Sequence, residues 1–316
     1  MEEKYLSVFI PIFNEEDNIS KLYSELKLVL KDAGFSYEII FIDDSSSDSS
    51  YKIMKDMAKD DKNVKVIHFK RNYGQTAAMQ AGFEYSSGKI VISMDGDLQN
   101  DPKDIPRLIK KVNEGHDVAC GWRKNRKDKL LSRRIPSLIA NRLISKITGL
   151  KLNDYGCTLR AYKDEIAKSI YLHGDMHRFI PAFAFWEGAS IAEVIVNHRE
   201  REAGKSKYGI SRTYGVMLDL LTIKFISDYS TKPSHLFGGL GLTLCLAGFL
   251  AAIIAIVKKV LFGIFIHKNP LMLLAVMLFL IGIFFILMGL LAEIIVRIYY
   301  KSQNKPIFHI KDKINF

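Results

Sequence analysis

The chain has 316 residues, 48% of them hydrophobic, and a formal net charge of +11 at pH 7. Such a length accommodates one domain of about 230 residues and a smaller element. A basic surplus usually indicates a nucleic-acid partner or an anionic membrane surface. Because no motif that reads RNA or DNA is present and two long apolar runs follow Leu236, we expect a membrane surface and phosphate-bearing substrates, and no nucleic acid.

Short apolar runs alternate with segments of helical periodicity in the part of the chain before the long apolar runs. The run Ile90 to Met94 is rich in β-branched residues, which indicates a buried parallel strand. We expect strands at 6–12, 37–42, 64–69, 90–94, 117–121 and 192–198, and helices at 18–30, 76–85, 104–114 and 132–148. This alternation predicts an α/β fold with a doubly wound, mostly parallel sheet.

The strand predicted at 90–94 runs directly into Asp95-Gly96-Asp97. In open α/β sheets, ligands bind at the carboxyl ends of the strands, where these two carboxylates lie. Paired hard oxygen ligands suit Mg²⁺ or Mn²⁺, and such ions in turn suit phosphate oxygens. Gln99 adds a neutral oxygen two residues further on. The same residue types are also ordinary turn chemistry, so the motif alone is compatible with a simple turn.

The strand predicted at 37–42 is followed by the polar run Asp43-Asp44-Ser45-Ser46-Ser47-Asp48-Ser49. One interpretation is an N-capping cluster for the next helix. The other is recognition of a uridine, because carboxylates accept hydrogen bonds from the base N–H or the ribose hydroxyls. The two interpretations are compatible. Arg71 and Asn72, which follow the strand predicted at 64–69, are further candidates for nucleotide contact.

A strongly basic segment, residues 123–134, contains seven basic residues and one acidic residue. It could be a solvated flexible loop. We favour a mobile arm that contacts anionic lipid headgroups and an acceptor phosphate, because apolar runs long enough to span a membrane follow it.

Three motifs together resemble family 2 glycosyltransferases, and more narrowly the polyprenyl-phosphate sugar transferases, such as dolichol-phosphate mannosyltransferase and bacterial undecaprenyl-phosphate glucosyltransferases. The first motif is Asp95-Gly96-Asp97-Leu98-Gln99. The second is Asp154-Tyr155-Gly156-Cys157-Thr158-Leu159-Arg160, in which Cys157 and Thr158 depart mildly from the residues common in the family. The third is Arg201-Glu202-Ala203-Gly204-Lys205-Ser206-Lys207-Tyr208, and the resemblance as a whole covers residues 5–230.

The resemblance implies a GT-A fold and a divalent metal, Mg²⁺ or Mn²⁺, that holds the diphosphate of a nucleotide sugar. It implies that the metal ligands are Asp95, Asp97 and Gln99, and that Asp97 and Asp154 are catalytic. We expect the nucleotide-sugar site to contain Pro11, Asn14, Glu16, Asp44, Arg71, Asn72 and Asp95. The acceptor and its phosphates are expected to contact Arg123, Arg133, Arg160, Arg201, Ser206 and Lys207.

Asp154 is open to three interpretations. It could be the general base of the transfer, or it could orient the acceptor, Arg160 or the reacting sugar without taking a proton. A phosphate monoester has a second pKa of about 6 and is mostly a dianion at neutral pH, so it needs orientation and cations rather than deprotonation. A buried structural pair of Asp154 with Arg160 is the alternative without a functional role.

Two runs of 22 uncharged residues, 236–257 and 271–292, are each long enough to cross about 30 Å of hydrocarbon. Residues 211–229 have the pattern of an amphipathic helix at the membrane interface. We therefore expect a catalytic domain at 1–210, interfacial helices at 211–235, and a transmembrane hairpin with a cytosolic tail at 236–316. Because Met1-Glu2-Glu3-Lys4 does not begin a signal peptide, we expect a multi-pass inner (plasma) membrane protein with a cytosolic catalytic domain.

The expected activity is inverting transfer of one sugar from a nucleotide sugar to polyprenyl phosphate, by a protein that forms a homo-oligomer. UDP-glucose is the favoured donor on resemblance, while mannose, N-acetylhexosamine and amino-arabinose donors remain open. A processive polysaccharide synthase is a rival, but neither Trp122 nor Trp186 lies in the Gln-x-x-Arg-Trp motif of such enzymes. A non-catalytic scaffold of a sugar-lipid flippase is a second rival, against which the intact acidic motif argues.

Overall fold

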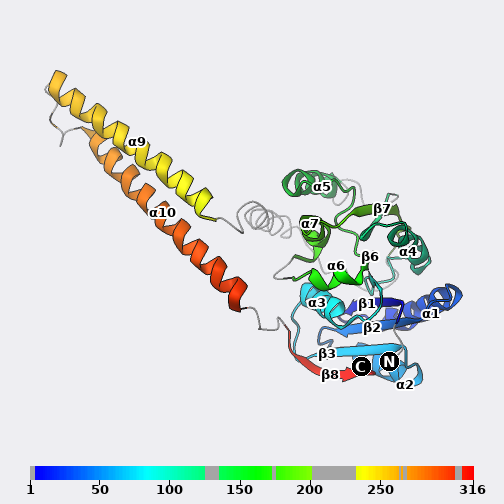
Figure 1. The fold of residues 1–316 in the computed structure, drawn as a ribbon. Coiled ribbons are helices and arrows are strands. Elements are labelled where there is room, and N and C mark those ends of the chain that lie inside the picture. The colour runs from blue at the N-terminus through cyan, green and yellow to red at the C-terminus, as the bar shows by residue number, and fades with distance from the viewer. Residues whose placement is uncertain are drawn as a thin grey trace. The chain divides into compact units, whose positions relative to one another are not determined.

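The computed structural model describes residues 4–124, 135–172, 176–200, 233–262, 265, 269–302 and 308–316. The chain divides into two compact units (Figure 1). One unit comprises Met1–Asp219 together with Pro306–Phe316, and the other comprises Leu220–Lys305. In chain order, the second unit is therefore an insertion between two segments of the first.

The first unit contains, among the described residues, one eight-stranded sheet in the order β7-β5-β6-β4-β1-β2-β3-β8. Its strands are β1 (Leu6–Ile12), β2 (Tyr37–Asp43), β3 (Val64–Phe69), β4 (Ile90–Ser93), β5 (Val118–Trp122), β6 (Arg160–Lys163), β7 (Ile191–Ile195) and β8 (Ile310–Ile314). Only β6 and β8 run against the others. The mostly parallel α/β sheet expected from the sequence is thus confirmed.

Helices cover both faces of this sheet (Figure 1). They are α1 (Glu16–Asp32), α2 (Ser50–Asp60), α3 (Gln75–Tyr85), α4 (Ile105–Asn113), α5 (Ile135–Thr148), α6 (Asp164–Ser169) and α7 (Ile180–Trp186). On one face, alternate residues of β1 share a core with apolar residues of α1, α2 and α4. Each fully buried leucine or isoleucine there contributes about 1.5–3 kcal/mol through removal of its surface from water.

On the opposite face, α3 lies close to β1 because its residues are small. A Cβ atom added at Gly82 would lie 2.3 Å from the ring of Phe9, and Ala77, Ala78 and Ala81 are buried. Phe9 and Phe83 meet edge to face, with their centroids 4.9 Å apart. The small residues of this helix therefore serve close packing of a crossover helix on the sheet.

The two antiparallel strands differ from expectation. β6 has the sequence Arg160-Ala161-Tyr162-Lys163 and fills the gap between β4 and β5. β8 belongs to the tail that sequence analysis grouped with the hairpin, yet it pairs with β3. The expected boundary at 236–316 therefore needs correction for residues 306–316, which cluster with the first unit.

The second unit contains two long apolar helices, α9 (Pro233–Phe262) and α10 (Pro270–Ser302). Within them, Phe237–Leu261 and Pro270–Ala292 are long and apolar enough to cross a membrane, with mean hydropathies of 2.7 and 3.1. Glycines allow the helices to approach closely, since a Cβ atom at Gly241 would lie 2.5 Å from the carbonyl oxygen of Gly282. Small residues of this kind are typical of helix contacts in membranes. The expected interfacial helix at 211–229 lies outside the described residues.

Candidate active site

The carboxyl ends of β1 to β5 lie at one edge of the sheet, because these five strands run in the same direction. β6 runs the opposite way and begins at this edge, with Arg160 opposite Ser93 and Cys120. The segment before β6, which contains Asp154, therefore meets the loops that follow β4 and β5. The structure thus brings the acidic motif after β4 and the aspartate motif before β6 to the same place.

Strained backbone marks the same edge. Asn14, Ser45 and Leu98 have φ angles of 54°, 61° and 63°, and they follow β1, β2 and β4. This region costs an L-residue about 1–2 kcal/mol, and asparagine enters it most easily. Such strain persists only where the surroundings impose it, and it is typical of binding and catalytic sites. Leu98 is only 2% exposed, so the core holds the turn that carries Asp97 and Gln99.

Two neutral donors hold the carboxylate of Asp95. The side-chain amide of Gln75 donates to Oδ1 at 3.1 Å, and the hydroxyl of Thr158 donates to Oδ2 at 2.6 Å. Gln75 begins α3 and Thr158 immediately precedes Leu159 and β6. Asp95 is therefore tied to both neighbouring elements and is held in a fixed position.

Burial raises the pKa of Asp95 to about 6, and the neighbouring carboxylate of Asp97 adds to the increase. The positive charges of Arg123 and Arg160 oppose it. The two carboxylates therefore repel each other in a poorly solvated place, which is the electrostatic situation that a bound cation relieves.

The donor set fits a divalent metal. Asp97 is 9% exposed, and its Oδ1 accepts the backbone N–H of Gln99 at 3.2 Å. Two carboxylates and an amide supply the hard oxygen atoms that Mg²⁺ and Mn²⁺ prefer. No group of three or more His, Cys, Asp and Glu side chains that could hold a metal occurs among the described residues. The roles of Asp95, Asp97 and Gln99 as metal ligands stay predictions.

The loops after β1 and β2 are hydrogen-bonded to each other. Asn14 Oδ1 accepts the backbone N–H of Ser47 at 2.8 Å, and Glu16 Oε2 accepts that of Ser49 at 2.8 Å. Pro11 is half-buried near the end of β1. The side chains expected at the nucleotide therefore order the loops of this edge, while their contact with a nucleotide stays a prediction.

Asp44 connects the loop after β2 to the loop after β3. Its two carboxylate oxygens accept the backbone N–H groups of Tyr73 and Gly74 at 2.7 and 2.8 Å. Burial raises the pKa of Asp44, and these two donors oppose the increase. Arg71 and Asn72 are exposed in the second loop, and the Arg71 guanidinium lies 4.7 Å from the centroid of the Tyr73 ring. Asp44 thus holds the backbone that directly follows the two predicted nucleotide contacts.

Asp154 forms a buried ion pair with Arg123. Nε and Nη2 of Arg123 donate to the two carboxylate oxygens at 2.7 and 2.9 Å, and the two side chains are 11% and 5% exposed. The backbone N–H groups of Arg123 and Gly156 donate to the same carboxylate at 3.3 and 3.0 Å. A Cβ atom at Gly156 would lie 3.0 Å from Arg123 Nη2, so glycine leaves room for the guanidinium.

Arg160 corrects one expectation. Its side chain is 1% exposed, Nη2 donates to the carbonyl oxygen of Tyr155 at 2.7 Å, and Nε and Nη1 have no hydrogen-bond partner among the described residues. A side chain enclosed in the sheet cannot contact an acceptor phosphate in this conformation. The alternative that Arg160 pairs with Asp154 is also wrong, because Arg123 occupies that carboxylate.

Four predicted phosphate-binding residues, Arg133, Arg201, Ser206 and Lys207, lie outside the described residues. Most of the basic segment 123–134 does so as well, since residues 125–134 are not among the described ones. Their roles therefore stay predictions.

Sequence reasoning missed several residues that build this edge. Thr158 and Gln75 hold Asp95, and His68 Nδ1 lies 2.6 Å from Asp43 Oδ2 in a buried hydrogen bond. Thr158 belongs to the second motif, but the sequence indicates only that it departs from the residues common in the family, not that it binds Asp95. Nothing in the sequence indicates the roles of Gln75 and His68, because the residues to which they are hydrogen-bonded are distant in the sequence.

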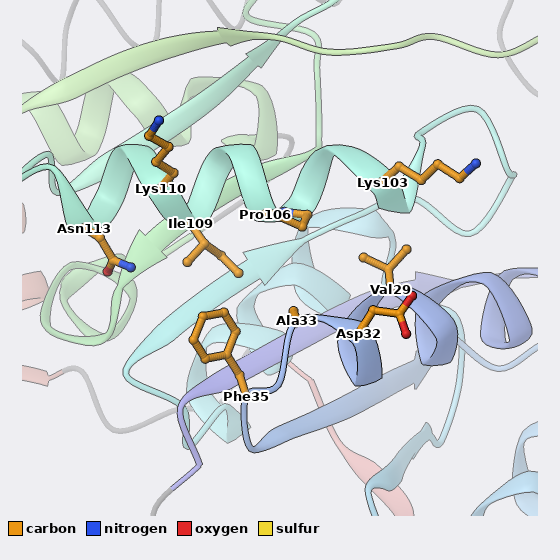
Figure 2. Close-up of a pocket in the computed structure, with 9 residues that line it drawn as sticks. All are labelled: Val29, Asp32, Ala33, Phe35, Lys103, Pro106, Ile109, Lys110 and Asn113. Atoms are coloured by element: carbon orange, nitrogen blue, oxygen red, sulfur yellow. The ribbon is translucent and has the colours of Figure 1, made fainter.

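A separate groove of about 600 Å³ lies between α1 and α4. Figure 2 shows the side chains of Phe35 and Ile109 on its two sides. None of the candidate site residues lines it. Its lining residues are Val29, Asp32, Ala33, Phe35, Lys103, Pro106, Ile109, Lys110 and Asn113.

These features define a metal-compatible acidic site at the edge of a mostly parallel α/β sheet, and comparison with known proteins agrees. The model of the family described as Glycosyl transferase family 2 matches residues 7–171, more than half of the chain. The chain belongs to glycosyl transferase family 2.

Two relatives match the chain along nearly its whole length. Dodecaprenyl-phosphate galacturonate synthase of Rhizobium johnstonii is 42% identical over 97% of this chain and 92% of its own. Undecaprenyl-phosphate 4-deoxy-4-formamido-L-arabinose transferase of Proteus mirabilis is 38% identical over 97% of this chain and 93% of its own. These relatives confirm the resemblance to polyprenyl-phosphate sugar transferases. Their names specify galacturonate and a formamido-arabinose rather than glucose.

Solved structures confirm the GT-A fold. The crystal structure of glucosyl-3-phosphoglycerate synthase from Mycobacterium tuberculosis, in complex with Mn²⁺, UDP and glucosyl-3-phosphoglycerate, has a TM-score of 0.53 at 16% identity. The likeness covers 71% of this chain and 80% of that one.

Proposed function

We propose that this protein transfers one sugar from a nucleotide sugar to a polyprenyl phosphate, with inversion at the anomeric carbon. One observation carries the proposal: the acidic pair Asp95 and Asp97 lies at the same sheet edge as the Asp154–Arg123 ion pair, in a chain that matches such transferases over 97% of its length. The first pair suits a donor diphosphate, and the second suits an acceptor phosphate.

Asp97 and Gln99, with Asp95 beside them, would hold the divalent metal. When bound, the metal offsets the negative charge that develops on the departing nucleoside diphosphate. Mg²⁺ and Mn²⁺ both suit these oxygen ligands. The loops of β1, β2 and β3 would hold the nucleoside, through Asn14 and Asp44 in particular.

The acceptor phosphate is its own nucleophile. With a second pKa of about 6 it is mostly a dianion at neutral pH, so one of its oxygens can attack the anomeric carbon without losing a proton. The bond from that carbon to the diphosphate oxygen breaks, and its electron pair leaves with the nucleoside diphosphate. The chain must therefore supply orientation and positive charge rather than a base.

Arg123 is the cation best placed for this task among the described residues of the site. Asp154 already accepts hydrogen bonds from four N–H groups, two of them on the Arg123 side chain. A carboxylate engaged in this way is a poor base, because hydrogen bonds to its charged form stabilise that form. We propose that Asp154 orients Arg123, which contacts the acceptor phosphate.

The donor is proposed to be a UDP-sugar. UDP-glucose, favoured by the initial resemblance, is one candidate. Galacturonate and 4-deoxy-4-formamido-L-arabinose are the sugars in the names of the two relatives, and they deserve equal weight in an assay. Homo-oligomer formation stays a prediction.

The proposed location is the cytosolic face of the inner (plasma) membrane. The residues before α9 and the strand after α10 belong to one sheet, so both must lie on the same side of a membrane. If the chain crossed the membrane once, these two parts would lie on opposite sides, whereas two crossings return the chain to the same side. This supports a hairpin that spans the membrane twice.

The test is turnover by the full chain in lipid nanodiscs that contain undecaprenyl phosphate. A panel of labelled nucleotide sugars should yield one lipid-linked monosaccharide, formed with added Mg²⁺ or Mn²⁺ and lost in excess chelator. Asp60→Asn is a matched control that changes an exposed aspartate at the end of α2, away from the site.

Absence of transfer from every donor would refute the proposal. A product of many linked sugars would instead support a processive polymerase.

A further inference from the structure

The C-terminal strand β8 is the outermost strand of the sheet, next to β3. It lies on the side of the sheet where β2 and β3, and the loops that follow them, are found. β8 pairs antiparallel with β3, with Asp312 opposite His68. The side-chain amide of Asn315 donates to the carbonyl oxygens of Ala58 and Val64 at 2.6 and 2.8 Å. The strand is therefore anchored along its length rather than placed loosely beside the sheet.

The beginning of this segment packs on the loop after β3. Phe308 is 3% exposed and its ring stacks on Phe69, with the centroids 5.0 Å apart. The backbone N–H of Lys70 donates to the carbonyl oxygen of His309 at 2.9 Å. The His309 ring lies 6.2 Å from the ring of Tyr73, at an interplanar angle of 62°. The loop that carries Arg71 and Asn72 is thus supported by the tail.

The middle of the segment supports the loop after β2. The hydroxyl of Tyr51 donates to Asp312 Oδ2 at 2.5 Å, and the Tyr51 ring stacks on His68 with the centroids 4.1 Å apart. His68 is hydrogen-bonded to Asp43 at 2.6 Å, and Asp43 accepts the backbone N–H of Ser46 at 3.2 Å. Four side chains therefore connect the C-terminal strand to the serine-rich loop.

The same two loops also meet each other, because Asp44 holds the backbone of Tyr73 and Gly74. In the order β4-β1-β2-β3, strand spacings of about 4.8 Å put the loop after β2 roughly 10 Å and the loop after β3 roughly 14 Å from the acidic pair at β4. If a diphosphate occupies the acidic pair, the nucleoside lies toward these loops.

We infer that the segment Phe308–Ile314 is part of the donor site, and that it positions the loops after β2 and β3 for the nucleoside of the nucleotide sugar. This inference rests on the proposed function. His309 and Asp312 are positioning residues, since they act through Tyr73 and through Tyr51 and His68. Neither contacts Asp154 or Arg123, so acceptor binding and the chemical step do not depend on them.

The experiment uses the full chain in nanodiscs and measures binding of UDP with Mn²⁺ by calorimetry, together with steady-state transfer. His309→Ala and Asp312→Ala should each raise the Kd of UDP and the KM of the donor about tenfold. The kcat and the acceptor KM should stay within about twofold of the parent, since a positioning effect confined to the donor loops changes donor binding.

Two matched variants separate positioning from loss of the fold. Asp312→Asn keeps an oxygen that accepts the Tyr51 hydroxyl, and it should restore parental donor binding. Lys311→Ala changes an exposed residue of the same strand and should behave as the parent. A lower melting temperature with parental Kd and donor KM would mean that the segment is only structural, which overturns the inference.

Two different results distinguish failure of this inference from failure of the proposed function. A parent chain that binds UDP and transfers sugar, with His309→Ala and Asp312→Ala indistinguishable from it, refutes this inference alone. A parent chain that neither binds UDP nor transfers sugar refutes the proposed function and this inference with it.

Discussion

Replacement of Asp154 by asparagine separates an orienting role from a base role. The substitution keeps the shape of the side chain and exchanges one acceptor oxygen for an NH₂ group. In the structure, Oδ1 accepts from Arg123 Nη2 and from the backbone N–H of Gly156, while Oδ2 accepts from Arg123 Nε. Whichever oxygen is replaced, the new NH₂ group faces a donor, and the bidentate ion pair is lost.

The structure sets the size of the expected effect. The two side chains are 11% and 5% exposed, so the variant leaves a poorly solvated guanidinium without its counter-charge. Breaking a buried pair in this way costs about 3–5 kcal/mol. Loss of one preorganised group that stabilises a reacting anion lowers kcat by about 100-fold, or about 2.7 kcal/mol in the activation barrier.

The assay is transfer at saturating donor and metal between pH 5.5 and 8.5, a range of about one and a half pH units on either side of neutrality. If Asp154 orients Arg123, Asp154→Asn is slow at every pH, and its acidic limb still follows the acceptor phosphate near pH 6. Arg123→Lys should cause a similar loss, and the double variant should be little worse than either single variant, because both remove one interaction. Glu193→Gln is the matched control, since Glu193 holds the backbone of Asn153 and Asp154 without contacting Arg123.

Two results would refute this reasoning. One is recovery of Asp154→Asn selectively above pH 7, where the acceptor is already a dianion, which would establish the base role. The other is multiplication of the two single effects in the double variant, which would show that Asp154 and Arg123 act independently.

Three other predictions concern the metal, the ion pair and stability. Asp97→Asn should abolish most transfer at any Mg²⁺ or Mn²⁺ concentration with an unchanged melting temperature, and full turnover of the parent in excess chelator would contradict the metal assignment. Gly156→Ala should lower kcat about tenfold, because the added Cβ atom would lie 3.0 Å from Arg123 Nη2 and displace the guanidinium. A kcat equal to that of the parent would contradict the proposed role of Arg123. Asp117→Asn should destabilise the protein by about 1–2 kcal/mol at pH 7, because hydrogen bonds from Lys163 and Ser190 lower the pKa of Asp117 to about 2. That stabilisation is present above the unfolded pKa of about 4 and is lost as the pH falls toward 2. The melting temperatures of variant and parent should therefore converge in acid. A difference in melting temperature that stays constant down to about pH 3 would contradict this prediction.

The strands that sequence analysis found are those whose pattern is local. β1, β2, β3 and β4 are mostly apolar runs buried on both faces, and the acidic residues at the ends of β2 and β4 are adjacent to these runs in the chain. The spacing of Asp95, Asp97 and Gln99 could therefore be read without the fold. β6 could not be predicted from the sequence, because Arg160-Ala161-Tyr162-Lys163 has no apolar pattern. Only its pairing with β4 and β5 makes it a strand.

Partners of charged residues were harder to predict than the residues themselves. Asp154 and Arg160 lie in one motif, which suggested that they pair, whereas β5 delivers Arg123 to Asp154 from 31 positions away. Tyr51 and Asp312 are 261 positions apart. The alternation in Ile310-Lys311-Asp312-Lys313-Ile314 is a strand signal, but the neighbouring membrane helices suggested a simple tail.

The return of the chain to its first sheet has a consequence for biosynthesis. At about 5–20 residues per second, a ribosome needs several seconds to make the two apolar helices. During that time β3 has an open edge, because β8 follows both helices in the chain. Synthesis of both helices therefore precedes closure of the sheet. A nascent chain stalled before Ile310 would keep unpaired backbone groups along β3, which are a template for pairing with another chain.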